Sequence, residues 1–186
     1  NNYNIGLKDI LEHFPSFIQR RHLPKIFALY DIFNQVKDMP GSIAEFGVYK
    51  GCSLFTWLHI LETFLPNERM KKIYAFDHFK GYKSYHQKDT SPKWVIDKHG
   101  GCNLDDSGNE FIKELLKLHN NDSFLPGVER VVVIDGDIIE TVPKFKELNM
   151  GVRFSIINID VNLYEPVKVI LENFYEMLLP GGILML

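Results

Sequence analysis

The sequence predicts a doubly wound α/β domain with a mostly parallel sheet. Short apolar runs, bounded by glycine or charged residues, alternate with longer segments that have helical periodicity. The short runs are apolar almost throughout rather than at every second position. Strands of that kind are buried on both faces, as they are when helices cover both sides of a parallel sheet.

The alternation defines five expected strands and four expected helices. The strands are Ser42–Gly47, Lys72–Asp77, Arg130–Asp135, Phe154–Asp160 and Gly182–Leu186. The helices between them are Cys52–Phe64, Asn109–His119, Ile138–Leu148 and Pro166–Leu179. The last apolar run resembles the middle of a strand, so we expect the C-terminal strands of the fold to be missing.

Two further segments complete the expected organisation. Residues 7–37 have apolar positions at helical spacing, interrupted near Pro15 and Pro24, and predict an N-terminal helical cap over residues 1–40. Residues 41–186 form the predicted α/β binding domain. The stretch Lys80–Ser107 has no clean period, and a loop of this length inside a compact domain is usually a lid or a binding loop, or is disordered.

The bulk composition restricts the class of partner. With 186 residues, 45% of them hydrophobic, the chain suits one globular domain. A net charge of -3 offers no basic field for nucleic acid or for an anionic membrane, and we find neither a signal peptide nor a membrane span. The two cysteines, Cys52 and Cys102, form no disulfide framework, which predicts a cytoplasmic protein. The sequence leaves open whether the chain forms a homo-oligomer.

The stretch IAEFGVYKG at residues 43–51 predicts a tight turn from a strand into a helix. Gly47 and Gly51 would let the backbone lie close to a ligand at the free N–H groups of the helix start. The spacing is not the GxGxxG of dinucleotide sites, and no GK[ST] follows. Glu45, just ahead of the turn, would repel phosphates but suit the ammonium and sulfonium of S-adenosylmethionine.

The other strand ends carry acids whose roles have simpler alternatives. Asp77 ends the second strand, where a carboxylate can accept hydrogen bonds from ribose hydroxyls, as it also does in NAD sites. Asp77 could instead cap a turn, and Asp137 could simply be the N-cap of the helix that it precedes. Cys52 at a helix start is expected to be a small buried residue rather than a reactive thiol.

Four motifs in order resemble the macrocin O-methyltransferase family of class I S-adenosylmethionine-dependent enzymes, which have a Rossmann-like fold. They are EFGVYKGCS at 45–53, DHFKGY at 77–82, DGDIIETVP at 135–143 and IDVNLYEPVKVILENFYEMLLPGGI at 159–183. The resemblance covers the chain from about Gly41 onward. It implies transfer of a methyl group to a hydroxyl, usually on a sugar, with a divalent metal such as magnesium.

The resemblance also implies roles for single residues. Around the cofactor it places Glu45, Gly47 and Ser53 near the methionine moiety, Asp77 and Phe79 near the ribose and adenine, and Asp137 near the adenine. Phe46 and Gly51 are also expected to bind the cofactor. Asp160 matches the catalytic and metal-binding carboxylate. Methyl transfer to an alcohol needs help for the hydroxyl to lose its proton: a divalent ion bound by carboxylates lowers the pKa of a coordinated oxygen, and an adjacent carboxylate or histidine can take the proton.

Two departures from the family pattern concern the metal. The family commonly has D-x-D-x-Y after the fourth strand, whereas this chain has Asp160, then Asn162 and Tyr164. Asn162 offers a neutral oxygen, so any metal affinity that depends on a second charge is reduced. The family also places an aspartate pair after the fifth strand, at positions that would follow Leu186.

Several residues remain open as acceptor contacts, and two other functions compete. The histidines His78, His86 and His99 could act as a base or bind substrate, although each is more often an ordinary surface residue. The aromatic residues Tyr82, Tyr85 and Trp94 could stack on a sugar or fold the loop down. The alternatives to a methyltransferase are a degenerate, noncatalytic binding protein and an NAD-dependent enzyme of Rossmann type.

Overall fold

The computed structural model describes residues 5–81, 86–89 and 107–186. In these residues five strands form one parallel sheet: β1 (Ser42–Phe46), β2 (Ile73–Asp77), β3 (Val131–Asp135), β4 (Phe154–Ile159) and β5 (Leu178–Met185). Their order in the sheet is β3-β2-β1-β4-β5. The predicted α/β class with a parallel sheet is therefore confirmed.

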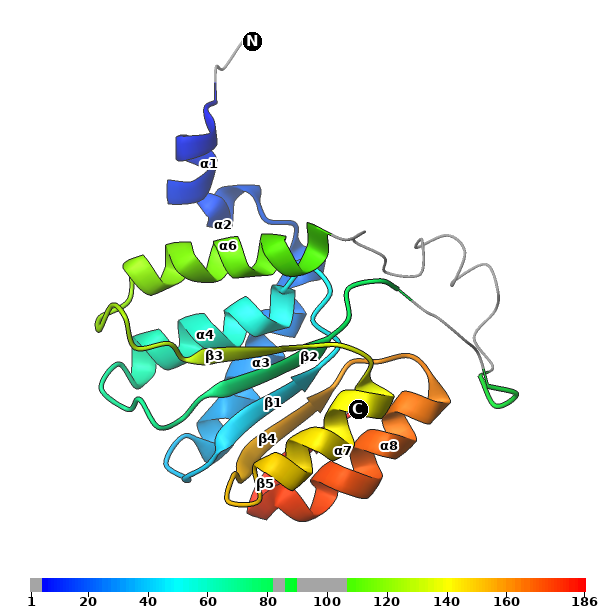
Figure 1. The fold of residues 1–186 in the computed structure, drawn as a ribbon. Coiled ribbons are helices and arrows are strands. Elements are labelled where there is room, and N and C mark those ends of the chain that lie inside the picture. Colours follow the sequence, from blue (N-terminus) through cyan, green and yellow to red (C-terminus); the bar gives the residue numbers. More distant parts are fainter. Residues whose placement is uncertain (1–4, 82–85, 90–106) are drawn as a thin grey trace.

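Helices cover both faces of the sheet (Figure 1). One layer contains α3 (Leu23–Val36), α4 (Cys52–Phe64) and α6 (Gly108–Asn121), and the other contains α7 (Ile138–Leu148) and α8 (Tyr164–Phe174). A 3-10 turn at Tyr175–Met177 continues from α8 into β5. Each layer encloses a hydrophobic core of its own, which explains why the strands are apolar almost throughout.

Successive residues of β1 face opposite layers. Ile43 belongs to the core that contains Trp57 of α4, whereas Phe46 belongs to the core on the side of α7 and α8. The Phe46 ring stacks on Phe76 of β2 with 4.7 Å between the ring centroids. By the same alternation, Glu45 faces α4, so β1 carries one acid into an apolar layer.

The N-terminal segment consists of α1 (Leu7–Glu12), α2 (Phe14–Phe17), a 3-10 turn at Arg20–His22, and α3. The interruptions expected near Pro15 and Pro24 are confirmed, since each proline lies at the start of a helix. Neither α1 nor α2 buries a residue, and in Figure 1 both extend away from the body on the side of α6. By contrast, α3 packs into the core through Leu29, Phe33 and Val36. The boundary at residue 40 stays a prediction.

The predicted end of the fourth helix, Pro166–Leu179, is wrong. The helix ends at Phe174, and Leu178 already pairs with Phe154 as the first residue of β5. Two leucines before Pro180 fit helical and strand periodicity equally well, so the pattern could not separate them. A register shift between β4 and β5 accommodates the Pro-Gly-Gly segment inside the strand.

In the part of the chain that the structure describes, no helix is both long enough and apolar enough to cross a membrane.

Candidate active site

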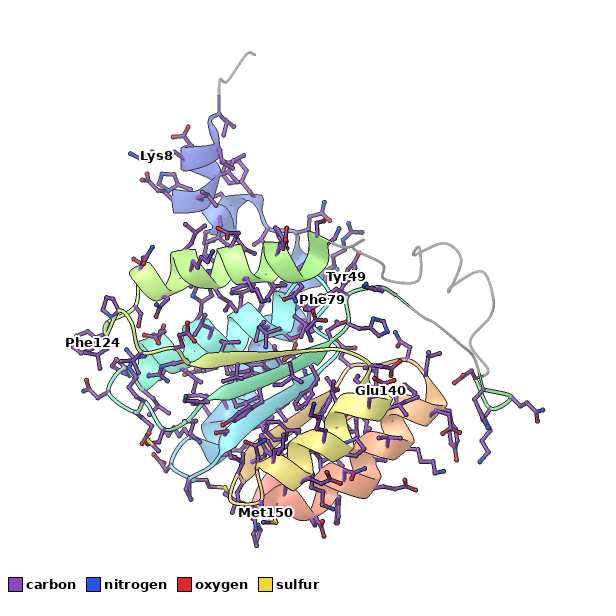
Figure 2. The ribbon with its side chains drawn as sticks, viewed as in Figure 1. Lys8, Tyr49, Phe79, Phe124, Glu140 and Met150 are labelled. Atoms are coloured by element: carbon purple, nitrogen blue, oxygen red, sulfur yellow. The ribbon has the colours of Figure 1, made fainter. Side chains whose placement is uncertain are left out.

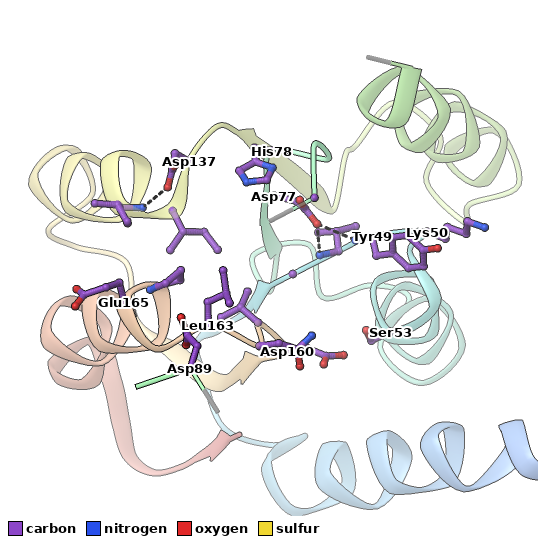
Figure 3. Close-up of a pocket in the computed structure, with 18 of the residues that line it drawn as sticks. Tyr49, Lys50, Ser53, Asp77, His78, Asp89, Asp137, Asp160, Leu163 and Glu165 are labelled. Atoms are coloured by element: carbon purple, nitrogen blue, oxygen red, sulfur yellow. Dashed lines mark hydrogen bonds between the residues drawn. The ribbon is translucent and has the colours of Figure 1, made fainter. Parts of the chain in front are cut away.

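A cavity of about 470 Å³ opens at the carboxyl ends of β1, β2 and β4 (Figure 3). The strand order reverses beside β1, and ligands of open α/β sheets bind at such a reversal. Six of the predicted site residues line the cavity together: Gly47, Ser53, Asp77, Asp137, Asp160 and Asn162. Four others, Glu45, Phe46, Gly51 and Phe79, lie behind its wall.

Gly47 lies where the turn after β1 passes closest to the end of β4. Its φ is +89°, and an added Cβ would lie 2.4 Å from the backbone oxygen of Asp160. The backbone N–H of Asp160 donates to the oxygen of Phe46 at 2.8 Å, which fixes the two chain segments against each other. Only glycine permits both this φ and this approach. Gly51, the N-cap of α4, lies under the ring of Phe55 and not in the cavity wall.

The carboxylate of Asp77 joins the two loops that border the cavity. Its Oδ2 accepts hydrogen bonds from the N–H groups of Val48 and Tyr49, both at 2.8 Å, and its Oδ1 accepts one from Phe79 at 2.7 Å. Tyr49 and Phe79 have left-handed φ values of 50° and 58°, and Figure 2 shows both at the same edge of the sheet. Asp77 therefore does cap a turn, as the simpler alternative expected.

The same contacts leave Asp77 limited room for a ligand. An ionised carboxylate has about four acceptor positions, and backbone groups occupy three of them. Asp77 still lines the cavity, so the remaining position can accept one hydroxyl. The predicted contact with a ribose stays a prediction, with Asp77 able to make one such hydrogen bond.

Glu45 lies directly behind the cavity wall and is fully buried. Ser53 donates its hydroxyl to Glu45 Oε1 at 2.6 Å, and the amide of Asn158 donates to Oε2 at 3.4 Å. Burial raises the pKa of Glu45 to about 7, although the bonds from Ser53 and Asn158 and the charge of Lys25 act in the opposite direction. Because Ser53 lines the cavity and Glu45 does not, a ligand meets the Ser53 hydroxyl first.

The side chains of Phe46 and Phe79 point into the two cores and not into the cavity. Phe46 is 0% exposed and Phe79 is 2% exposed. Phe79 belongs to the core shared by α3 and α4, on the opposite side of the sheet from Phe46. Their predicted contact with a cofactor stays a prediction.

Asp137 and Cys52 both begin helices at the cavity. Asp137 is the N-cap of α7, and its carboxylate accepts a hydrogen bond from the N–H of Ile139 at 3.0 Å. The N-cap interpretation is therefore confirmed, and Asp137 lines the cavity as well. The expectation that Cys52 is buried is wrong: it is exposed and lines the cavity, because the first residue of α4 faces the turn and not the sheet.

Asp160 faces the cavity from the end of β4 and pairs with a lysine that the sequence analysis missed. Lys25 Nζ lies 2.9 Å from Asp160 Oδ2, although the two residues are 135 positions apart. Burial acts to lower the pKa of Lys25, but the hydrogen bond to Asp160 and the charges of Asp160, Cys52 and Glu45 raise it above its ordinary value. The pair depends on how α3 packs beside β4, which no local motif encodes.

The described residues do not fit a divalent cation. The predicted ligands Asp160 and Asn162 both line the cavity. However, no three His, Cys, Asp or Glu side chains within residues 5–81, 86–89 and 107–186 are grouped so that they could hold a metal ion. Asn162 has no charge, and Asp160 is already paired with an ammonium group. Magnesium and calcium require several oxygen ligands, which this donor set does not supply.

Two of the candidate histidines, His78 and His86, line the cavity. The ring of His86 stacks on Tyr164, with 4.9 Å between centroids, and its Nε2 lies 3.4 Å from Glu165 Oε1. Asp89 accepts a hydrogen bond from the N–H of Tyr164 at 2.7 Å, so residues 86–89 are attached to the start of α8. The other candidates in this stretch, Tyr82, Tyr85, Trp94, His99 and Cys102, lie outside the described residues.

The charges around the cavity are mostly negative. Five carboxylates and two lysines line it: Asp77, Asp89, Asp137, Asp160 and Glu165, with Lys25 and Lys50. Such a lining favours a cationic ligand. Of these residues, sequence reasoning missed Lys25, Lys50, Asp89 and Glu165. A lysine in the first turn of α3 was the one available signal, because a positive charge there is unfavourable to the helix itself.

Comparison with known proteins gives one family and several similar structures. A family described as "Methyltransferase domain" matches residues 44–186. The crystal structure of CalS11, described as a calicheamicin methyltransferase, is similar with a TM-score of 0.90 and 28% sequence identity, covering 98% of this chain and 71% of CalS11. No curated protein sequence matches this chain.

Two further structures are similar. An apo structure of CalS11, described as a TDP-rhamnose 3'-O-methyltransferase, has a TM-score of 0.79 and 28% identity, covering 98% of this chain and 70% of that one. The O-methyltransferase NovP has a TM-score of 0.66 and 19% identity, covering 86% of this chain and 62% of NovP. The likeness to NovP shows the fold alone.

Proposed function

Because this chain belongs to the methyltransferase domain family, we propose that it transfers a methyl group from S-adenosylmethionine to a hydroxyl of a sugar or of a glycosylated metabolite. The family and the likeness to CalS11 make the chain a methyltransferase enzyme and support S-adenosylmethionine as its methyl donor. The sugar acceptor is supported by the likeness to CalS11, whose described substrate is TDP-rhamnose.

One observation carries this proposal. Two strand-end carboxylates, Asp77 and Asp160, open onto the same cavity on either side of the Gly47 turn. Asp77 has one acceptor position left for a donor hydroxyl, and Asp160 faces the remaining space from β4. The excess of carboxylates around the cavity suits a sulfonium donor, and the Gly47 turn lacks the GxGxxG spacing of NAD sites.

For methyl transfer, the protein must position the acceptor oxygen and help it to lose its proton. Transfer from a sulfonium is an in-line displacement, so the acceptor oxygen must be held against the methyl carbon. The oxygen attacks as its proton leaves, and the half-exposed carboxylate of Asp160 is placed to accept that proton. The methyl donor leaves as a neutral thioether. Magnesium assistance stays a prediction, because Asp160 and Asn162 alone do not supply the oxygen ligands that magnesium requires.

Incubation of the full chain with methyl-labelled S-adenosylmethionine and TDP-rhamnose, followed by mass spectrometry, tests the proposal. We expect one methyl group on a sugar oxygen, and a loss of about 100-fold in rate for Asp160→Asn with S-adenosylhomocysteine binding retained. The matched control is Asp135→Asn at the end of β3, which is exposed and does not line the cavity. Binding of S-adenosylhomocysteine with no transfer to TDP-rhamnose or to phosphate-free rhamnosides would contradict the proposed acceptor.

A further inference from the structure

We propose that Lys25 is a catalytic residue of the methyl transfer, whose ammonium binds the acceptor oxygen beside Asp160. This inference rests on the proposed function and goes beyond it, since it assigns a chemical role to a residue of the N-terminal helical segment. It starts from the observation that Lys25 Nζ lies 2.9 Å from Asp160 Oδ2 and that both residues line the same cavity.

The Lys25 ammonium has more hydrogen-bond donors than its contact with Asp160 uses. Lys25 Nζ carries three N–H groups, and in the described part of the chain its hydrogen-bond partner is Asp160 Oδ2 at 2.9 Å. Two donors are left, and both Lys25 and Asp160 line the cavity. An ammonium next to a carboxylate matches a hydroxyl group, because the carboxylate accepts the O–H while the ammonium donates to the oxygen.

The ion pair between Lys25 and Asp160 contributes little to the stability of the fold. The side chains of Lys25 and Asp160 are 45% and 50% exposed, and ion pairs with that exposure contribute little to folding. Lys25 also lies in the first turn of α3, where a positive charge opposes the helix dipole. The helix itself is fixed by Leu29, Phe33 and Val36 in the core, so it presents Lys25 to the cavity from a rigid support.

The reaction step balances with these groups. The O–H proton of the acceptor passes to the Asp160 carboxylate as the oxygen attacks the methyl carbon. The O–CH3 bond forms while the C–S bond breaks, and its electron pair stays on the sulfur, which leaves as a neutral thioether. Lys25 keeps its protons throughout and stabilises the negative charge that develops on the oxygen. Asp160 then returns its proton to solvent.

The test compares Lys25→Met and Lys25→Arg in the full chain, with S-adenosylmethionine and TDP-rhamnose as substrates. Lys37→Met is the matched control, since Lys37 is exposed at the other end of the same helix. We expect Lys25→Met to lower kcat by about 100-fold, as the loss of one donor to a developing oxyanion does. Lys25→Arg should recover part of that loss because it keeps the charge, and the thermal midpoint and S-adenosylhomocysteine binding should stay at wild-type values.

The inference is overturned if Lys25→Met keeps the wild-type kcat, or if it loses S-adenosylhomocysteine binding in parallel with kcat. A wild-type chain that transfers no methyl group overturns the proposed function and this inference together, which distinguishes that failure from a failure confined to the Lys25 variants.

Discussion

Ser53 Oγ lies 2.6 Å from Glu45 Oε1; both residues are buried, but Ser53 lines the cavity whereas Glu45 does not. This hydrogen bond joins the end of β1 to the first turn of α4. The Ser53 hydroxyl therefore lies between the cavity and the Glu45 carboxyl group, whose pKa is about 7. The ionisation of Glu45 therefore affects both the stability of the fold and the polarity of the part of the cavity that is expected to bind the methyl donor.

The free energy of unfolding is expected to fall as the pH rises from about 4.5 to about 7. Burial raises the pKa of Glu45 from 4.5 to about 7, despite the opposing effects of Ser53, Asn158 and Lys25. Between these values the folded chain keeps a proton that the unfolded chain has released, so each increase in pH favours unfolding. Above about 7 both states are ionised, and a penalty of about 3 kcal/mol remains.

Urea unfolding across that pH range measures this dependence. Glu45→Gln cannot ionise but keeps an oxygen for the Ser53 hydroxyl, so its stability should change less with pH than that of the wild type. Glu147→Gln, at an exposed position of α7, serves as the control and should retain the wild-type slope. Parallel curves for the wild type and Glu45→Gln would show that Glu45 does not cause the pH dependence.

Asp77→Asn should weaken both the fold and the binding of the methyl donor. The amide nitrogen cannot accept a hydrogen bond, so at least one of the backbone N–H groups of Val48, Tyr49 and Phe79 loses its partner. The expected loss of stability is about 2 kcal/mol, and calorimetry should show weaker binding of S-adenosylhomocysteine. Asp135→Asn makes the same change at the neighbouring strand end and should leave that binding intact. Equal binding by both variants would refute the role given to Asp77.

Gly47→Ala should destabilise the chain by more than about 2 kcal/mol and abolish donor binding. The new Cβ would lie 2.4 Å from the Asp160 backbone oxygen, at a φ of +89° that side chains rarely adopt. Gly151→Ala is the control, because nothing lies within 4 Å of the Cβ that it would add. Denaturant unfolding compares the two variants. A Gly47→Ala chain as stable as Gly151→Ala would show that the turn does not need glycine.

Asn162→Asp should increase the affinity of the cavity for Mn²⁺. The substitution adds a carboxylate two residues after Asp160, and divalent cations prefer charged oxygen ligands. Calorimetry with Mn²⁺ should show tighter binding than in the wild type, and Asp160→Asn in the same background should remove it. Strong binding by the wild type that depends on Asp160 would mean that the described residues do form a cation site.

Much of the site could be predicted because it consists of strand ends. The apolar runs located β1, β2 and β4, and parallel strands bring their carboxyl ends to one edge, so Gly47, Asp77 and Asp160 were expected together. The strand period of two also puts Glu45 on the face of α4. The strand period could not show that Ser53 of α4 would lie between Glu45 and the cavity, because the position of Ser53 depends on the rotation of α4 about its axis.

The remaining contacts depend on packing between distant segments. Lys25 reaches Asp160 only because α3 packs beside β4, and Asp89 reaches the first turn of α8 across 75 positions. Neither contact has a local spacing that sequence periodicity could detect. The exposure of Cys52 was missed for a related reason: the first residue of a helix follows the geometry of the preceding turn and not the apolar stripe of the helix.

Calorimetry of the full chain with S-adenosylhomocysteine and with NAD tests the central claim most directly. The acidic cavity beside the Gly47 turn is expected to bind S-adenosylhomocysteine in the micromolar range and to show no measurable heat with NAD at the same concentrations. Binding of NAD that is tighter than that of S-adenosylhomocysteine would contradict the account, because the Gly47 turn lacks the GxGxxG spacing with which dinucleotide sites hold a pyrophosphate.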